Sequence, residues 1–162
     1  MGDLHSFRVG DDEFAVRRAR RADLPELVAL IADDPLGRGR EGAPSPAYEA
    51  AFEQLDADPA QLLAVLTAAD GSVVGMLQLT TIPGLSRGGA LRAQIESVRV
   101  HSAFRGCGLG RHLFAWAIAE SRRRGCALVQ LTSDRTRAGA HSFYARLGFV
   151  DSHVGYKLDL TG

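Results

Sequence analysis

A glycine-rich run between two patterned segments constrains this chain more than any other feature. Residues 91–100 are rich in apolar and β-branched side chains and predict a strand, whereas residues 108–124 place apolar side chains at helical spacing. The run Arg105–Gly110, RGCGLG, joins them. Glycines let a backbone approach a phosphate closely, and a helix start offers unpaired N–H groups with partial positive charge. We therefore predict a strand–turn–helix unit with an anion site at its turn.

The glycine pattern alone has low specificity. A Gly-x-Gly pair also occurs in ordinary tight turns, so the pattern leaves a purely structural turn open. The run lacks the Gly-x-Gly-x-x-Gly of dinucleotide-binding folds and the Gly-Lys-Ser/Thr of nucleoside triphosphate sites. Those two classes of nucleotide site are therefore disfavoured.

The rest of the chain predicts a mixed α/β domain. Residues 1–12 are polar, contain two glycines and show no period, so we expect a flexible leader, followed by one domain over 13–162. Asp70-Gly71 between two apolar runs predicts a hairpin. The expected strands cover 14–18, the two arms of a hairpin within 61–82, 91–100, 126–131 and one or two segments of 149–160; the expected helices cover 24–31, 45–55, 108–124 and 136–147.

The alternation of side chains slips within the strand at 91–100. Ala93 and Ile95 share one face, and Val98 and Val100 join that face only if one extra residue is inserted near Glu96. Because side chains alternate strictly along a strand, this slip predicts a β-bulge. A strand with Ser97 simply facing inward explains the same pattern, so both interpretations stay open here.

Charge and cysteine content exclude several function classes. The chain of 162 residues has 19 basic and 19 acidic side chains, so no overall field favours nucleic acid or an anionic membrane. No apolar run approaches the roughly 20 residues of a membrane span, and the N-terminus lacks a signal-like apolar stretch. Neither the two cysteines nor the scattered histidines have metal-binding spacing. We expect a cytoplasmic protein with no metal, nucleic-acid or membrane partner.

Two motifs in this order resemble a known family. The run Arg105–Gly110 resembles the Arg/Gln-x-x-Gly-x-Gly/Ala signature of the GCN5-related N-acetyltransferase (GNAT) superfamily, and it follows a strand-like segment, as in that family. Residues 143–149, FYARLGF, resemble the family's Phe-Tyr-x-x-x-Gly-Phe ending. The resemblance spans 91–150. It implies a central mixed sheet, with a V-shaped splay between strands 91–100 and 126–131, flanked by about four helices.

The resemblance also implies acetyl-CoA as cosubstrate. Its pyrophosphate would lie on the glycine-rich turn, and its pantetheine arm would enter the splay and pair with backbone groups of the bulged strand, as an added strand would. The residues so assigned to the cofactor are Val98, Arg99, Val100, Arg105, Gly106, Cys107, Gly108, Leu109, Gly110 and Arg111.

Three residues are implied in catalysis. The Val98 N–H is a candidate donor to the thioester oxygen, where negative charge builds. Glu96 is the candidate base for the incoming ammonium, through water, although it could merely bind the amine or pair with Arg92 or Arg99. Tyr144 matches the tyrosine that protonates the departing thiolate in many members; the alternative is an ordinary aromatic on an apolar helix face.

Two positions need separate comment. Many members carry an asparagine seven residues before this tyrosine, but here the residue is Arg137, which could contact a phosphate or be a solvated surface side chain. Cys107 lies inside the turn, where a helix N-terminus favours a thiolate, so a route through an acyl-cysteine is conceivable. We expect Cys107 to be passive, because its side chain should point away from phosphates bound by backbone.

The implied reaction is acetyl transfer to a primary amine, by direct attack in a ternary complex. Residues 148–153 faintly resemble members that act on small aminoalkyl compounds, which favours a small acceptor. A protein acetyltransferase acting on a lysine or N-terminal amine is the alternative enzyme, and a noncatalytic CoA-binding sensor is the alternative from another class. An edge strand near the C-terminus would support a homodimer. The loops expected to frame the acceptor pocket are 33–46, with Asp33, Asp34 and Glu41, 85–90, and the tail around His153 and Tyr156.

Overall fold

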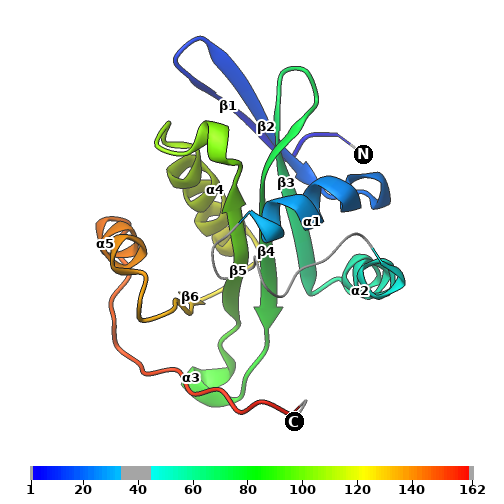
Figure 1. Cartoon of the computed structure of the whole chain (residues 1–162). Coiled ribbons are helices and arrows are strands. Elements are labelled where there is room, and N and C mark those ends of the chain that lie inside the picture. The colour runs from blue at the N-terminus through cyan, green and yellow to red at the C-terminus, as the bar shows by residue number, and fades with distance from the viewer. Residues whose placement is uncertain (1, 34–44, 161–162) are drawn as a thin grey trace.

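The computed structural model describes residues 2–33 and 45–160. Its centre is a six-stranded sheet in the order β1-β2-β3-β4-β5-β6, antiparallel except for the parallel pair β5–β6 (Figure 1). This mixed sheet with flanking helices confirms the predicted fold class. The strands are β1 His5–Val9, β2 Asp12–Arg18, β3 Gln61–Ala68, β4 Val73–Ile82, β5 Arg92–Val100 and β6 Leu128–Leu131.

The described helices lie on both faces of the sheet. They are α1 Leu24–Ala32, α2 Pro46–Ala57, α4 Leu109–Arg123 and α5 Ala138–Arg146, with a single turn α3 Ser86–Gly89 and two 3-10 turns, η1 Arg21–Asp23 and η2 Ser102–Phe104. The predicted loop at 33–46, with Asp34 and Glu41, lies almost entirely outside the described residues.

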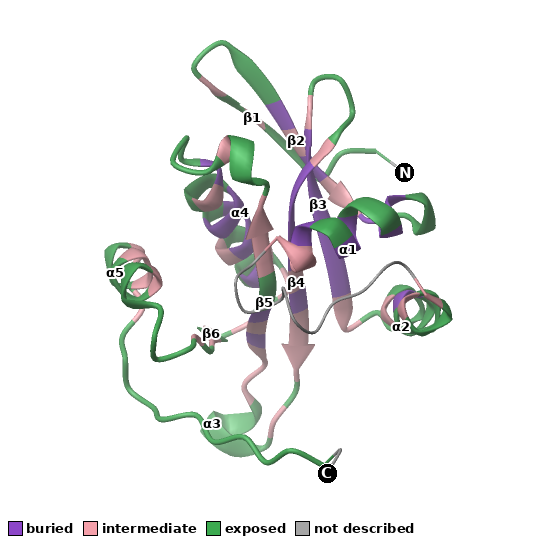
Figure 2. Ribbon diagram, in the orientation of Figure 1, coloured by how far each residue is buried: buried purple, intermediate pink, exposed green. Residues whose placement is uncertain are grey.

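Two apolar clusters hold these layers together. Side chains of α4, among them Leu113 and Phe114, pack against one face of the sheet, and α1 and α2 pack against the other through Leu27 and Phe52. Strand β3 is buried on both faces, as the purple ribbon in Figure 2 shows, because its alternate residues enter different clusters. A strand buried on both faces reads as a continuous apolar run, which matches LLAVL at 62–66.

An ion pair fastens β2 to the start of α1. Arg17 donates from Nη1 and Nη2 to the two carboxylate oxygens of Asp23, at 2.7 and 2.8 Å, and the Arg20 N–H donates to the same carboxylate at 2.7 Å. Burial alone would raise the pKa of Asp23. The hydrogen bonds from Arg17 and Arg20 outweigh it and lower that pKa below its usual value.

The expected flexible leader is wrong over residues 5–9. These residues form β1, which pairs antiparallel with β2 from His5↔Val16 to Val9↔Asp12. Gly10 supplies the positive φ of the connecting turn, at 61°. Phe7 stacks on His112 of α4 at 4.4 Å between ring centroids. These tertiary contacts order a segment whose own sequence shows no strand period.

The final strands expected within 149–160 are also wrong. The structure has no strand there, although Val154, Tyr156 and Leu158 alternate as in a strand. These three side chains are exposed, and residues 150–160 are green in Figure 2. Alternation fits a strand geometrically, but a strand also needs backbone partners, and the ladder of the described sheet ends at β6.

Candidate active site

Strand β5 is interrupted by a bulge next to Glu96. Glu96 pairs with Gln78 and Arg99 pairs with Met76, so Ser97 and Val98 together lie opposite one residue of β4. Ser97 adopts φ of 52°, one of two positive values among the described non-glycine residues. Ala93 and Ile95 are buried before the bulge, and Val98 and Val100 pack against the same cluster after it. The predicted bulge is therefore confirmed, and the alternative with Ser97 facing inward is excluded.

Strands β5 and β6 part at this bulge. Their parallel pairing runs only from Arg92↔Leu128 to Ile95↔Leu131, while β5 continues to Val100. Beyond Ile95 two carbonyls of β5 accept hydrogen bonds from arginine side chains: Val98 O from Arg99 Nη1 at 2.8 Å, and Val100 O from Arg105 Nε at 3.1 Å. This half of β5 therefore offers its backbone on the side where β6 has diverged, as the predicted splay requires.

The glycine-rich turn follows η2 directly. Gly106 and Gly108 have φ of 83° and 86°, in the left-handed region that side chains disfavour. A Cβ built on either glycine meets no atom within 4 Å. Backbone conformation, and not packing, therefore requires glycine at both positions, and the space above them is open. Cys107 between them is exposed, with its Sγ 4.0 Å from the Arg105 carbonyl oxygen.

Helix α4 begins at this turn and is fixed by its first residue. Leu109 is fully buried in the cluster between α4 and the sheet, so only its backbone is available to a ligand. Gly110 faces Phe143 of α5, whose Cζ lies 3.9 Å from a Cβ built on the glycine. Arg111 is exposed on the same turn. The first N–H groups of a 15-residue helix, with an arginine beside them, suit an anion.

Tyr144 lies in an aromatic cluster between α4 and α5. Its ring packs edge-on against Phe114 and Phe143, with centroids 5.6 Å apart in each case. Burial raises the pKa of the Tyr144 phenol above its ordinary value, and the positive charges of Arg137 and Arg99 lower it in part. The phenol therefore stays protonated at neutral pH and lies within electrostatic range of β5.

Glu96 is exposed at the bulge, on the sheet face opposite α4. Its cross-strand neighbour is Gln78, and Gln94 precedes it by two residues on the same face. The structure thus places Glu96, Val98 and Arg99 close together on one bulged strand, and the positive charge of Arg99 lowers the pKa of Tyr144 in part.

Sequence reasoning missed the polar residues around Glu96 and the partner of Arg105. Gln78 and Thr80 on β4, and Gln94 on β5, form with Glu96 a polar group on one sheet face. The signal was present as a polar residue at every second position of these strands. The Arg105 guanidinium contacts Asp33 at the end of α1, 72 residues earlier in the chain, and no local pattern reveals such a contact.

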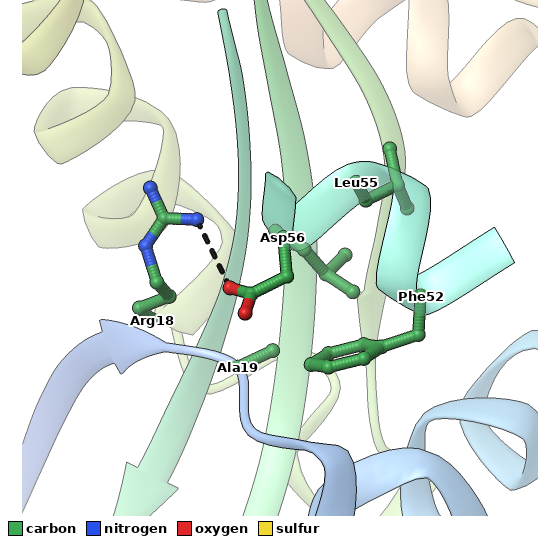
Figure 3. Close-up of a pocket in the computed structure, with 6 residues that line it drawn as sticks. Arg18, Ala19, Phe52, Leu55 and Asp56 are labelled. Carbon is green, nitrogen blue, oxygen red and sulfur yellow. Dashed lines mark ion pairs between the residues drawn. The ribbon is translucent and has the colours of Figure 1, made fainter. Parts of the chain in front are cut away.

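Two hollows lie beside α1 and α2. One, of about 400 Å³, lies between α1 and the segment after β5, and it is lined by Glu26, Ala29, Leu30, Asp33, Val73, His101 and Ser102. The other lies where α2 meets the sheet (Figure 3). It is lined by Phe52 and Leu55 and by the ion pair between Arg18 and Asp56, whose charged atoms lie 3.5 Å apart. It is therefore a packing contact between α2 and the sheet, with no room for a ligand.

Neither a metal centre nor a membrane helix is found in the part of the chain that the structure describes. Across residues 2–33 and 45–160, no group of three or more His, Cys, Asp and Glu side chains converges to hold a metal ion. Over the same ranges no helix is both long and apolar enough to cross a bilayer.

Comparisons with known proteins agree with this geometry. An aminoalkylphosphonate N-acetyltransferase of Salmonella typhimurium is 35% identical over 91 residues, 56% of this chain and 58% of that protein. A glucosamine 6-phosphate N-acetyltransferase of Trypanosoma brucei brucei is 37% identical over 90 residues, 56% of this chain and 59% of that protein. The matched region thus spans somewhat under two thirds of each of these two relatives.

A solved structure matches more of the chain. The crystal structure of a transcriptional regulator from Bacillus halodurans C-125 superposes with a TM-score of 0.87 and 43% identity, covering 91% of this chain and 99% of that one. The model of the acetyltransferase (GNAT) family matches residues 24–149, which include the bulge, the glycine-rich turn and Tyr144. The chain therefore belongs to the GNAT acetyltransferase family.

Proposed function

We propose that this protein transfers an acetyl group from acetyl-CoA to the primary amine of a small molecule, by direct attack in a ternary complex. The observation that carries the proposal is the parting of β5 from β6 at the Ser97 bulge, immediately before the glycine-rich turn. The names of two relatives support a small acceptor, since both describe acetylation of small amines.

The residues present fit acetyl-CoA. Open space above Gly106 and Gly108, the first N–H groups of α4 and the cations Arg105 and Arg111 suit a pyrophosphate. The backbone of β5 from Val98 to Val100 suits the amides of pantetheine, which would displace the arginine side chains now bonded to it. When bound, the cosubstrate supplies an activated thioester.

Each catalytic group then has a defined task. Glu96 takes the proton of the ammonium through water, so that the free amine can form its bond to the thioester carbon. The Val98 N–H stabilises the negative charge that builds on the thioester oxygen. Tyr144, whose phenol is protonated at neutral pH, donates its proton to the sulfur as the carbon–sulfur bond breaks. The positive charge of Arg137 lowers the pKa of this phenol in part.

One alternative has support of its own. The 43% identical neighbour is named a transcriptional regulator, and a CoA-binding sensor without turnover would suit that name. The chain's net charge of 0 gives no strong attraction to DNA by itself. A protein acetyltransferase is the second alternative, and it predicts turnover of peptides rather than of small amines.

The deciding experiment measures thiol release from acetyl-CoA with a panel of small amines and lysine peptides. We expect acetyl-CoA to raise the melting temperature, because it binds the folded state, and a small amine to give turnover. If acetyl-CoA raises the melting temperature but no amine is acetylated, the acetyltransferase proposal is wrong and the CoA-binding sensor is favoured. Faster turnover of peptides than of every small amine would favour the protein acetyltransferase.

A further inference from the structure

One sheet face next to Glu96 carries a group of uncharged polar side chains. The pairing register places them in rows: Gln78 lies opposite Glu96, and Thr80 lies opposite both Gln61 and Gln94. Gln94 in turn lies opposite β6. Cross-strand partners share a face, so all of them project to the side of α1 and α2. We call this group the amide floor, and it consists of Gln61, Gln78, Thr80, Gln94 and Gln130.

Hydrogen bonds order the amide floor into two sets. The Gln61 Oε1 accepts from Gln78 Nε2 at 3.2 Å and from Thr80 Oγ1 at 2.8 Å. The Gln94 Oε1 accepts from Gln130 Nε2 at 2.7 Å. Among the described residues, the Gln78 Oε1 and the Gln94 Nε2 have no partner. The floor therefore presents an acceptor on Gln78, across from Glu96, and a donor on Gln94, two residues before Glu96.

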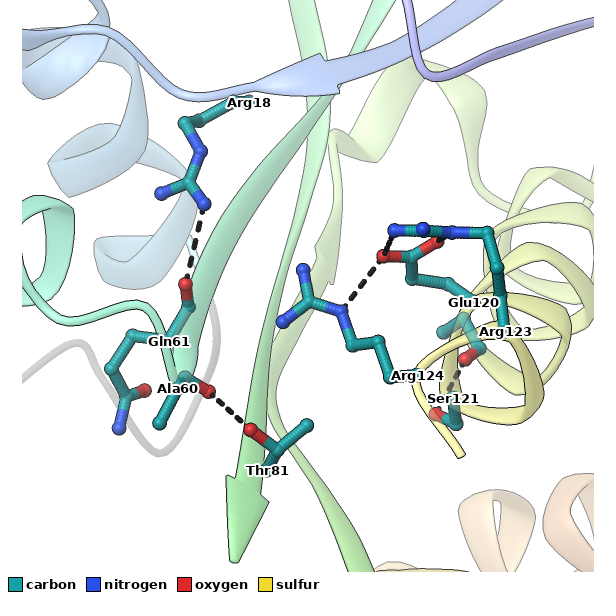
Figure 4. A network of polar contacts seen from close by, with 9 residues as sticks. Arg18, Ala60, Gln61, Thr81, Glu120, Ser121, Arg123 and Arg124 are labelled. Atoms are coloured by element: carbon teal, nitrogen blue, oxygen red, sulfur yellow. Dashed lines mark hydrogen bonds and ion pairs between the residues drawn. The ribbon is translucent and has the colours of Figure 1, made fainter. Parts of the chain in front are cut away.

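The backbone beneath Gln61 is itself held in place. Arg18 Nη2 donates to the Gln61 carbonyl at 3.4 Å, and Thr81 Oγ1 donates to the neighbouring Ala60 carbonyl at 3.2 Å (Figure 4). These bonds tie the start of β3 to the ends of β2 and β4. The Gln61 amide, which bridges two other side chains, thus stands on a backbone that three strands fix.

The floor begins where the apolar cover of α1 ends. One row higher on the same face, Met76 is buried under α1, whereas Gln78 and Thr80 are only half-buried. The floor also adjoins the candidate reacting centre: Gln94 lies two residues, about 7 Å along the strand, from Glu96, and Gln78 is directly across from it. A molecule bound on the floor would therefore lie against Glu96 and the bulge.

We propose that the amide floor binds the acceptor and selects a small primary amine that bears several hydroxyl groups, such as an amino sugar. This inference rests on the proposed acetyltransfer. Hydroxyls both donate and accept, as amides do, so they can satisfy Gln78 Oε1 and Gln94 Nε2 together. An alkylamine would leave these half-buried groups desolvated without partners, which costs affinity. The ammonium end faces Glu96, the one carboxylate at the floor among the described residues.

Two arginines, Arg92 and Arg99, share this sheet face with the floor. The Arg92 guanidinium turns toward the hairpin between β4 and β5, with its Nη1 3.4 Å from a Cβ built on Gly84. The Arg99 guanidinium donates to the Val98 carbonyl. The side chains that flank Glu96 in the strand register, Gln78 across from it and Gln94 two residues before it, are amides, which match the hydroxyl groups of an acceptor.

The test compares the acetylation of glucosamine with that of cyclohexylamine, two ring amines of which only glucosamine bears hydroxyl groups. Rates are calculated for the concentration of unprotonated amine, so that the two amines can be compared at one pH. We expect kcat/KM for glucosamine to exceed that for cyclohexylamine about 100-fold, because a site built to hydrogen-bond rejects the analogue without partners. Gln78→Leu and Gln94→Leu should each lower kcat/KM for glucosamine about tenfold, through KM, and should raise kcat/KM for cyclohexylamine, because the unpartnered amide is removed. Gln54→Leu, the same change on the exposed side of α2, should leave both unchanged.

Results that refute acceptor binding by the amide floor can be told apart from results that refute acetyltransfer. Amines acetylated without a preference for hydroxyls, or a preference that survives both floor variants, would overturn this inference and leave acetyltransfer intact. Better turnover of a lysine peptide than of glucosamine would also overturn it. If no amine turns over, the thermal shift with glucosamine and CoA decides: a shift lost in Gln78→Leu supports the floor, and no shift refutes it.

Discussion

Arg105 joins the glycine-rich turn to the end of α1 through Asp33. Its Nη2 lies 2.6 Å from the Asp33 Oδ2, and its Nε donates to the Val100 carbonyl at 3.1 Å. The guanidinium therefore spans the strand end where pantetheine would pair and the turn where pyrophosphate would lie. About half of the arginine side chain is exposed, so an incoming phosphate can reach it. Binding of acetyl-CoA would exchange the carboxylate for phosphate.

The first prediction concerns this exchange. Arg105→Gln should weaken acetyl-CoA binding about tenfold or more, because a charge-assisted contact to phosphate is lost. Asp33→Asn should strengthen binding by no more than about fivefold, since an exposed ion pair is worth up to about 1 kcal/mol. Titration calorimetry measures both. In the double variant, Asp33→Asn should no longer increase the affinity for acetyl-CoA. An increase that remains without Arg105 would show that Asp33 acts on the cofactor independently of Arg105.

The second prediction separates backbone strain from cofactor binding. Gly108→Ala and Gly71→Ala both place a side chain at positive φ, 86° and 85°, in open space. Each should cost about 1–2 kcal/mol of unfolding free energy. Only Gly108→Ala should also abolish the melting shift with acetyl-CoA, because its methyl group occupies the space that a phosphate needs. Equal shifts in the two variants would place the pyrophosphate elsewhere.

The third prediction tests Tyr144 as the proton donor. Tyr144→Phe keeps the edge-on ring contacts with Phe114 and Phe143 but removes the hydroxyl. We expect kcat to fall about 100-fold with an unchanged Kd for acetyl-CoA. Tyr48→Phe makes the same chemical change on α2, which packs against β3, and should keep full turnover. An unchanged kcat in Tyr144→Phe would assign this proton transfer to water.

The fourth prediction concerns Glu96 and pH. Glu96→Gln should lower the rate most at neutral pH, where an alkylammonium with a pKa near 10 must lose its proton before attack. The deficit should shrink as the pH rises toward that value, because the free amine then needs no base. Steady-state rates between about pH 6.5 and 10 give the profile. A deficit that stays constant with pH would indicate that Glu96 only binds the amine.

The fifth prediction uses the ion pair between Arg17 and Asp23. Because the pKa of Asp23 is lowered in the folded state, its stabilisation is present in full above the unfolded value of about 3.9 and is lost as the pH falls through the folded pKa. Asp23→Asn should therefore cost about 2–3 kcal/mol of unfolding free energy at neutral pH, and less below about pH 3. Urea titrations of this variant and of the exposed Asp11→Asn control measure the difference.

Most of the element order was predictable from sequence, and the bulge was one of two interpretations that the side-chain pattern allowed. The hairpin at Asp70-Gly71, the helix after the glycine-rich turn and the phase slip at Glu96 are local features, in which neighbouring residues set the backbone conformation. The failures lie at both ends of the chain. Strand β1 is ordered by Phe7 stacking on His112, and the alternating tail at 149–160 lacks a strand partner in the structure.

The sequence by itself determined that the side-chain alternation of β5 slips near Glu96 and that a glycine-rich turn opens α4, because alternation and glycine conformation are properties of consecutive residues. Only the tertiary structure decided what surrounds them. The contact between Arg105 and Asp33 joins residues 72 positions apart, and the amide floor takes its members from four strands. Strand register brings such residues together, and register depends on how the whole sheet packs against its helices.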